Sequence, residues 1–198
     1  MLRNGLLAAL MLGFLMPAAA PKLSIDSNHS TVGFAVPIAG GLSKVRGKFT
    51  DYSVTVVHDE LDISRASFTA TIKAASINTG IPERDAHLRG ADFFDVEKFP
   101  EITFQSERIE KKEQQLTAYG TFTMHGVSKQ IALPFTITGR HVTKTDVSNT
   151  MNVGYSLRSK LNRRDYGINW RHDASPDFVG DEIEIEIDLI SKSSPAPK

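Results

Sequence analysis

Residues 84–100 read RDAHLRGADFFDVEKFP and break a pattern that the rest of the chain keeps. On both sides of this stretch, apolar and polar residues alternate as they do in β-strands. Inside it, charged residues such as His87 stand beside Leu88, Phe93 and Phe94. That mixture is typical of a short helix and turn lying over the open end of a β-structure, with aromatic side chains turned inward. We therefore predict that this segment is a lid over an apolar cavity.

The lid begins with a predicted helix over residues 82–89. Pro82 suits the first turn of a helix, acidic residues follow it, and Gly90 is a common end point. Arg84 and His87 are three residues apart and share a helix face. Their side chains could tie the lid to the strands through ion pairs, or they could donate hydrogen bonds to the head group of a ligand.

About eight other segments alternate as strands do, and no strand–helix alternation repeats, so we predict an all-β fold with antiparallel strands. Such strands build a barrel or a sandwich. A change of parity near Thr50 and Asp51 indicates a bend of the kind that curves a barrel. Pro134 predicts an edge or a distortion in its strand, because proline donates no ladder hydrogen bond. The bend and the lid favour an eight-stranded antiparallel barrel, which is wide enough for one slender ligand.

Both ends of the chain lie outside the predicted domain. Arg3, an uncharged apolar run over residues 6–16 and three alanines follow the order of a secretory signal, which we expect over residues 1–20. Residues 191–198 are polar and contain proline, so we expect them to form a disordered tail. Residues 21–190 then form a single barrel domain.

Composition and motifs exclude several classes of function. The 23 basic residues balance the 23 acidic residues, so we expect no nucleic-acid partner. The six histidines are scattered without a metal-binding H-E-x-x-H spacing, and no G-x-S-x-G nucleophile motif occurs. We therefore predict no metal site, no catalytic residue and no cofactor apart from a bound ligand.

Several short motifs follow one another along the chain: IDSNHS at 25–30, VGF at 32–34, VRGKF at 45–49, SINTG at 76–80, RDAHL at 84–88, DFFDV at 92–96, FPEITF at 99–104, TFTMHGVSK at 121–129 and LNRRDYGI at 161–168 with Trp170. Taken in this order, they resemble the YceI-like polyisoprenoid-binding proteins. The resemblance covers nearly the whole domain.

The resemblance implies a lipocalin-like barrel with a long apolar tunnel, secretion to the periplasm and binding of a long-chain isoprenoid lipid, such as a polyprenyl phosphate or an isoprenoid quinone. The residues alone indicate export, a barrel and a mouth lined by aromatic and charged side chains. The identity of the lipid comes only from the resemblance. We expect a carrier whose contacts with inner-membrane proteins are transient. An exposed edge near Pro134 or in the last strand could pair two copies as a homodimer.

The expected ligand contacts fall into two groups. Aromatic residues that face the lumen should supply affinity, while Arg84, His87 and Arg163 should set the preference for a head group. The complete set of expected ligand-binding residues is Phe34, Phe49, Phe68, Arg84, His87, Leu88, Phe93, Phe94, Phe104, Phe122, Phe135, Arg163, Tyr166 and Trp170.

Two other functions remain open from the sequence. The first is a barrel enzyme, an isomerase or hydrolase that acts on a lipid through His87 with Asp85 or Asp92. The second is a structural or interaction protein whose barrel is filled by its own side chains. Turnover of a bound lipid would indicate the first, and a barrel without a cavity would indicate the second.

Overall fold

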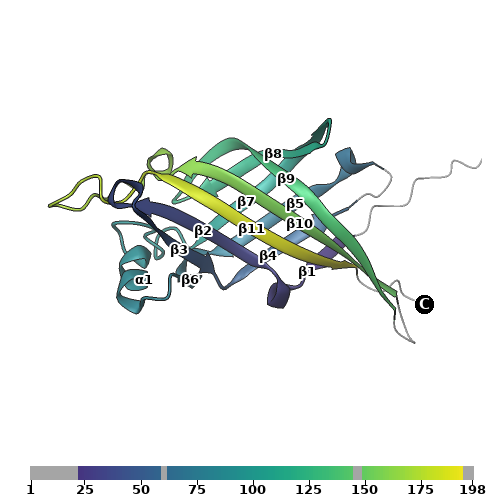
Figure 1. The fold of residues 1–198 in the computed structure, drawn as a ribbon, viewed down its shortest axis with the longest axis horizontal. Helices are drawn as coiled ribbons and strands as arrows, with labels where there is room; N and C mark the ends of the chain where they lie inside the picture. Colours follow the sequence, from purple (N-terminus) through teal and green to yellow (C-terminus); the bar gives the residue numbers. More distant parts are fainter. Residues whose placement is uncertain (1–21, 59–61, 145–148, 194–198) are drawn as a thin grey trace, which may run out of the picture.

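The structure, a computed structural model, describes residues 22–58, 62–144 and 149–193 (Figure 1). Its α-helix is α1 (Pro82–Arg89). Its strands are β1 (Lys22–Ile25), β2 (Thr31–Ile38), β3 (Ser43–Phe49), β4 (Tyr52–Val57), β5 (Ser67–Lys73), β6 (Ile77–Asn78), β7 (Glu101–Lys112), β8 (Gln115–Met124), β9 (Val127–Lys144), β10 (Asn149–Asn162) and β11 (Glu182–Ser193).

These segments form a closed antiparallel barrel of eight strands. The ring runs β1-β4-β5-β7-β8-β9-β10-β11, and a ladder between β11 and β1 closes it. β2, β3 and β6 extend β1, β4 and β5 toward one end of the barrel. There β2 pairs with β11, β3 pairs with β2, and β6 pairs with β3. The eight-stranded antiparallel barrel predicted from the sequence is confirmed.

A bend in each of the first three barrel strands opens one end of the ring. β3 stops at Phe49 and β4 starts at Tyr52, so the parity change at Thr50 and Asp51 marks a real bend. Asp51 accepts a backbone hydrogen bond from Lys73 at 3.0 Å, which joins this bend to the next strand. Past the bend β6 pairs with β3, and no ladder among the described residues joins it to β7. We call this splayed end the lid end.

The lid fills the gap that the splayed strands leave. α1 spans the predicted residues 82–89, with Pro82 in its first turn, and it stops at Gly90. Arg89 holds the helix against the barrel, since its guanidinium donates to the carbonyls of Ala75 and Ile77 at 2.7 and 2.8 Å. Figure 1 shows α1 beside β3 and β6, at the same end of the barrel as the loop between β10 and β11.

Pro134 belongs to β9, a strand of the ring, and lies next to the point where the ladder between β9 and β10 ends. β9 pairs with β8 along residues 127–135, whereas its ladder with β10 stops at Phe135, which faces Leu157. From Pro134 toward the lid end, β9 therefore has a free side. The predicted outer edge is wrong for β9 as a whole, because β9 has neighbours on both sides, but the predicted interruption of the ladder is present.

β11 continues beyond residue 190, the expected end of the domain. Residues 191–193 pair with β1, and Ser191 is fully buried with its hydroxyl donating to the Val153 carbonyl at 3.2 Å. The predicted tail therefore starts too early, because these polar residues close the barrel. The remainder of that tail, residues 194–198, and the expected signal, residues 1–20, lie outside the described residues.

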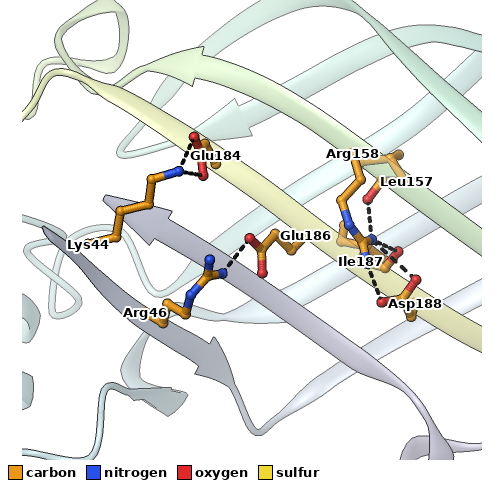
Figure 2. A network of polar contacts seen from close by, with 8 residues as sticks. All are labelled: Lys44, Arg46, Leu157, Arg158, Glu184, Glu186, Ile187 and Asp188. Atoms are coloured by element: carbon orange, nitrogen blue, oxygen red, sulfur yellow. Dashed lines mark hydrogen bonds and ion pairs between the residues drawn. The ribbon is translucent and has the colours of Figure 1, made fainter. Parts of the chain in front are cut away.

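Ion pairs cross the outer face of β2 (Figure 2). Lys44 on β3 lies 2.7 Å from Glu184 on β11, and Arg46 lies 2.6 Å from Glu186, although β2 runs between those two strands. The small side chain of Ala35 lets the cations reach over β2, and these groups cover it completely. Exposed pairs of this kind contribute little free energy each, so their main effect is to cover β2.

The end opposite the lid, which we call the basal end, is tightly packed. Leu23, Val56 and Val153 are at most 1% exposed there. Within the described residues, no helix has the length and hydrophobicity that crossing a bilayer requires. The barrel thus has one packed end and one end that a helix and loops cover.

We predict that Gly120→Ala destabilises the barrel. A Cβ at Gly120 would lie 2.1 Å from the carbonyl oxygen of Gln105, where β7 bulges between Ser106 and Arg108. The atoms that a Cβ would meet belong to the backbone of β7 and cannot move aside without disturbing the strand. We therefore expect a loss of about 1–3 kcal/mol in the free energy of unfolding, measured by urea denaturation. Gly139→Ala is the matched control, because a Cβ there meets nothing within 4 Å. Equal losses in both variants would contradict this account.

We predict a pH-dependent effect of Asp26→Asn at the β1–β11 seam. Hydrogen bonds from Lys192, and then from His29, lower the pKa of Asp26 from 3.8 to about 2. A carboxyl with a lowered pKa stabilises the fold above its unfolded pKa, and this contribution is lost as the pH falls through the folded pKa. The wild type should unfold at higher urea than the variant at neutral pH, and this gap should shrink between about pH 4 and pH 2.

The control for the seam is Asp173→Asn, which changes an exposed residue in the loop between β10 and β11. It should leave the urea midpoint unchanged at every pH. A gap for Asp26→Asn that stayed constant down to pH 2 would show that the carboxylate charge does not stabilise the seam.

Candidate functional site

A cavity of about 550 Å³ lies inside the barrel between the packed basal end and the lid. Its wall draws side chains from every ring strand except β1, from β2, β3 and β6, from α1 and the lid turn after it, and from the loop between β10 and β11. Most of these side chains are aliphatic or aromatic, and none is Asp or Glu. The lining residues that are classed as exposed to solvent are His87, His172 and Phe178. The mouth of the cavity is therefore at the lid end.

Three aromatic rings close the floor of the cavity. Phe68 packs edge-on against Phe135 and Tyr155, with ring centroids 5.1 and 5.5 Å apart. The Tyr155 hydroxyl lies 2.9 Å from Nδ1 of His58, which is fully buried on the basal side. Burial raises the pKa of Tyr155 to about 12, so this hydroxyl stays protonated at physiological pH. The floor therefore presents a neutral, apolar surface to the cavity.

A second aromatic group forms the wall nearest the lid. Phe49 packs against Phe34 at 5.8 Å and edge-on against Phe94 of the lid at 6.0 Å. Phe94 thus links the lid to β2 and β3, the strands that splay away from the ring. Phe104 and Phe122 stand opposite each other on the paired strands β7 and β8 and complete the aromatic lining.

The rim of the mouth combines two aromatic rings with a histidine. His87 lies edge-on to both Phe93 and Trp170, with centroids 5.0 and 5.2 Å away. Its Nε2 is 2.9 Å from the carboxylate of Asp92, and the two side chains are about half exposed. His87 therefore has a second ring nitrogen that can hydrogen-bond a polar group at the mouth, while Asp92 orients its ring.

Arg84 is partly occupied by contacts within the lid. Its Nε donates to the Thr79 hydroxyl at 2.7 Å and one terminal nitrogen donates to the Thr79 carbonyl at 2.9 Å. The Thr79 hydroxyl donates in turn to the Asp85 carboxylate at 2.5 Å, and the Thr79 backbone N–H donates to it at 2.8 Å. The bond from the hydroxyl, and then the bond from the N–H, lower the pKa of the Asp85 carboxyl. Among the described residues, the other terminal nitrogen of Arg84 has no hydrogen-bond partner. Arg84 thus braces the lid and keeps donors available on the cavity wall.

Arg163 acts as a brace. The buried guanidinium donates to four carbonyls of the loop between β10 and β11, those of Ile168, Trp170, Val179 and Gly180, at 2.9 to 3.5 Å. One terminal nitrogen also lies 2.9 Å from the carboxylate of Asp181. Burial lowers the pKa of the guanidinium. Its donors already have partners, so its geometry does not favour the predicted contact with a head group.

Almost all of the ligand-contact residues expected from the sequence stand on the cavity wall. The wall includes Phe34, Phe49, Phe68, Arg84, His87, Leu88, Phe93, Phe94, Phe104, Phe122, Phe135, Arg163 and Trp170. Tyr166 is not part of the wall. It is 2% exposed, packs edge-on behind Phe122 at 5.4 Å and lies under Lys129.

Part of the cavity wall was not predicted from the sequence. Tyr155 on the floor, His172 and Phe178 at the mouth, and the row of Ile183, Ile185 and Ile187 on β11 all line the cavity. The β11 row could have been found, because these residues alternate with acidic residues and share one parity. The two mouth residues carry no comparable signal, since they lie in an irregular loop.

Comparison with known proteins assigns the whole domain to one group. The family described as YceI-like domain matches residues 23–190. Protein YceI of Salmonella arizonae is 31% identical over 172 residues, which are 87% of this chain and 86% of that protein. The UPF0312 protein plu2095 of Photorhabdus laumondii is 30% identical over 171 residues, 86% of each chain.

Solved structures agree with this assignment. The Campylobacter jejuni YceI protein is 32% identical with a TM-score of 0.67, covering 77% of this chain and 87% of that one. A polyisoprenoid binding domain from Saccharophagus degradans has the same fold, with a TM-score of 0.62 at 16% identity, covering 88% of this chain and 99% of that one. These matches confirm the resemblance predicted from the sequence.

We predict that Arg163→Lys destabilises the loop between β10 and β11. A lysine ammonium cannot reproduce the planar fork of donors, so several buried carbonyls would lose their partners. The expected loss is about 2–4 kcal/mol in the free energy of unfolding, measured by urea denaturation. Arg164→Lys is the matched control, because Arg164 is less buried and, within the described part of the chain, its side chain bonds only to the Asp181 carboxylate. An Arg163→Lys variant of unchanged stability would refute the bracing role.

Proposed function

Because the chain belongs to the YceI-like family, we propose that it binds a long-chain isoprenoid lipid in its barrel cavity and carries it in the periplasm. The observation that carries this proposal is the cavity itself, which is apolar along its wall and floor and open at the lid end. The polyisoprenoid binding domain of Saccharophagus degradans, which has the same fold, supports the class of ligand. A polyprenyl phosphate and an isoprenoid quinone both fit this description.

Burial of the hydrocarbon chain supplies the affinity. Each buried CH₂ contributes about 0.8 kcal/mol, so one five-carbon isoprene unit contributes roughly 4 kcal/mol before the entropy of binding is subtracted. A few units therefore suffice for tight binding without a strong polar contact. The aromatic residues of the floor and wall supply most of this apolar surface.

The polar head group would stay at the mouth. The floor is closed by rings and a neutral hydroxyl, so a charged group at the basal end would lose its hydration without compensation. At the lid end, Arg84 and His87 line the cavity: one terminal nitrogen of Arg84 has no hydrogen-bond partner among the described residues, and His87 is about half exposed. We infer that the chain enters tail first and that these two residues set the head-group preference.

The arrangement supports binding more than catalysis. His87 pairs with Asp92, and Asp85 is held by Thr79, so of the two candidate partners only Asp92 contacts this histidine. The hydroxyl-bearing residues of the cavity wall are Thr103 and Tyr155, and no carboxylate lines it in the described part of the chain. A hydrolase or isomerase would need a nucleophile or a second acid–base group near the lipid. We therefore propose a carrier without catalytic residues, metal or cofactor.

Cellular location and partners follow from the proposed cargo. We propose that the expected signal directs the barrel to the periplasm, where it meets membrane lipid, and that contacts with inner-membrane proteins are transient. The side of β9 that lacks a partner strand near Pro134 is the surface through which we propose that two copies could pair as a homodimer. Gel filtration of the purified protein would show whether two copies pair.

The identity of the cargo is tested by native mass spectrometry of the protein purified from the periplasm of its own host. We expect one stoichiometric mass that organic extraction assigns to an isoprenoid. A protein that remains empty after incubation with quinones and polyprenyl phosphates would refute the proposal and favour a structural role. Turnover of the lipid that His87→Ala abolishes while binding persists would favour the enzyme.

We predict that Phe122→Asp abolishes lipid binding. Phe122 is 9% exposed and faces the cavity, so a carboxylate there would have to lose its hydration when the chain enters. Binding should fall at least about 100-fold, measured by titration with a short-chain isoprenoid alcohol. Phe122→Leu keeps an apolar side chain and should bind within about tenfold of the wild type. Circular dichroism must show a folded barrel, and a folded Phe122→Asp variant with full affinity would refute the site.

A further inference from the structure

Exposed apolar side chains gather at the lid end. The large hydrophobic residues that are most exposed in the described part of the chain are Leu42, Ile81, Val142 and Phe178. Leu42 is 90% exposed at the turn between β2 and β3, and Phe178 is 40% exposed in the loop between β10 and β11. Ile81 precedes α1, so only Val142 lies at the basal end.

Leu42 and Phe178 belong to one local structure, which we call the lid tip and define as residues 38–43 and 176–180. The backbone N–H of Ala39 donates to the Phe178 carbonyl at 2.7 Å, and that of Gly180 donates to the Pro37 carbonyl at 2.8 Å. An isolated bridge also pairs Ile38 with Val179. The loop between β10 and β11 extends beyond the barrel in Figure 1, on the same side as the β2–β3 turn.

The lid tip is continuous with the cavity. Ile38, Phe178 and Val179 line the cavity wall, and Phe178 is exposed to solvent at the same time. The lid tip therefore carries apolar side chains both outside the barrel, at Leu42, and on the cavity wall, at Ile38, Phe178 and Val179. The backbone at Gly40 and Gly41 has positive φ angles of 67° and 92°, and no atom lies within 4 Å of a Cβ placed there. The tip of the turn at Gly40, Gly41 and Leu42 thus projects outward, while Ile38 and Ala39 hold the turn to the loop between β10 and β11.

The charges around the lid tip are mixed. Arg171 and Asp173 precede its second segment, and Asp177 lies within that segment beside Phe178, all three exposed. Lys44, next to the turn, is already paired with Glu184. Such a surface gives no net attraction to an anionic bilayer, so any affinity for a membrane must come from inserted apolar side chains.

We propose that the lid tip inserts Leu42 and Phe178 into the surface of a lipid bilayer, so that a lipid passes between membrane and cavity past these apolar side chains. The direction of this transfer rests on the function proposed above. Two protruding side chains are far too small a surface for a stable protein interface, which buries about 1,000 Å² or more. They are sufficient for reversible contact with a bilayer, where affinity grows with the apolar area inserted.

Co-sedimentation with vesicles of phosphatidylcholine tests this proposal on the protein as secreted into the periplasm. The wild type should bind these vesicles, and added salt should change its affinity little. Leu42→Asp should bind about tenfold more weakly, because a charge replaces an inserted leucine. Val142→Asp is the matched control, since it places the same charge on an exposed valine at the opposite end, and it should bind as the wild type does. Equal vesicle binding by Leu42→Asp and the wild type would overturn the proposal.

A second measurement separates this proposal from the proposed function. Quenching of Trp170 at the mouth reports filling of the cavity by a short-chain isoprenoid alcohol added from solution. Leu42→Asp should fill as fast as the wild type from solution and about tenfold more slowly from vesicles. A wild type that fills from solution without binding vesicles would overturn docking and leave the carrier function intact. A wild type that binds vesicles but never fills would overturn the carrier function and leave docking intact.

Discussion

The ladder between β1 and β11 is the contact on which the rest of the structure depends. It joins residues 23–25 to residues 191–193 and converts an open sheet into a ring without a free edge at the basal end. Since the ring is closed there, the first three strands can bend away at the lid end without exposing the core. The cavity, its mouth and the segment that covers it are consequences of closing one end and splaying the other.

Much of this arrangement could be predicted from the sequence, because strand periodicity is a strong local signal. Alternation gave the strands, the parity change at Thr50 and Asp51 marked the bend, and the lack of alternation in residues 84–100 marked the lid. The polar residues at the end of β11 led to the wrong prediction of a tail from residue 191, because Ser191 is fully buried between strands. Ser191 is buried because its strand pairs with β1 to close the ring, and no local sequence pattern reveals that pairing.

The roles of the charged residues could not be predicted, because they depend on contacts across the fold. Arg163 and Arg84 have similar surroundings in the sequence, since each has an acidic residue within two positions and belongs to a motif with aromatic residues nearby. Arg163 donates to carbonyls of its own loop, whereas Arg84 keeps a terminal nitrogen available at the cavity wall. Tyr166 supports Phe122 from behind instead of lining the cavity. An aromatic residue in a conspicuous motif can thus shape a binding site without touching its contents.

The aromatic floor has a consequence for the size of the cargo. Phe68, Phe135 and Tyr155 stop the cavity above a packed layer that contains His58, so a chain cannot pass through the barrel. A hydrocarbon longer than the cavity must leave its surplus units outside the mouth, in contact with water or with another apolar phase. The distance from floor to mouth therefore limits the length of hydrocarbon chain that the cavity can bury. Isoprene units beyond that length add no affinity while the protein is free in solution.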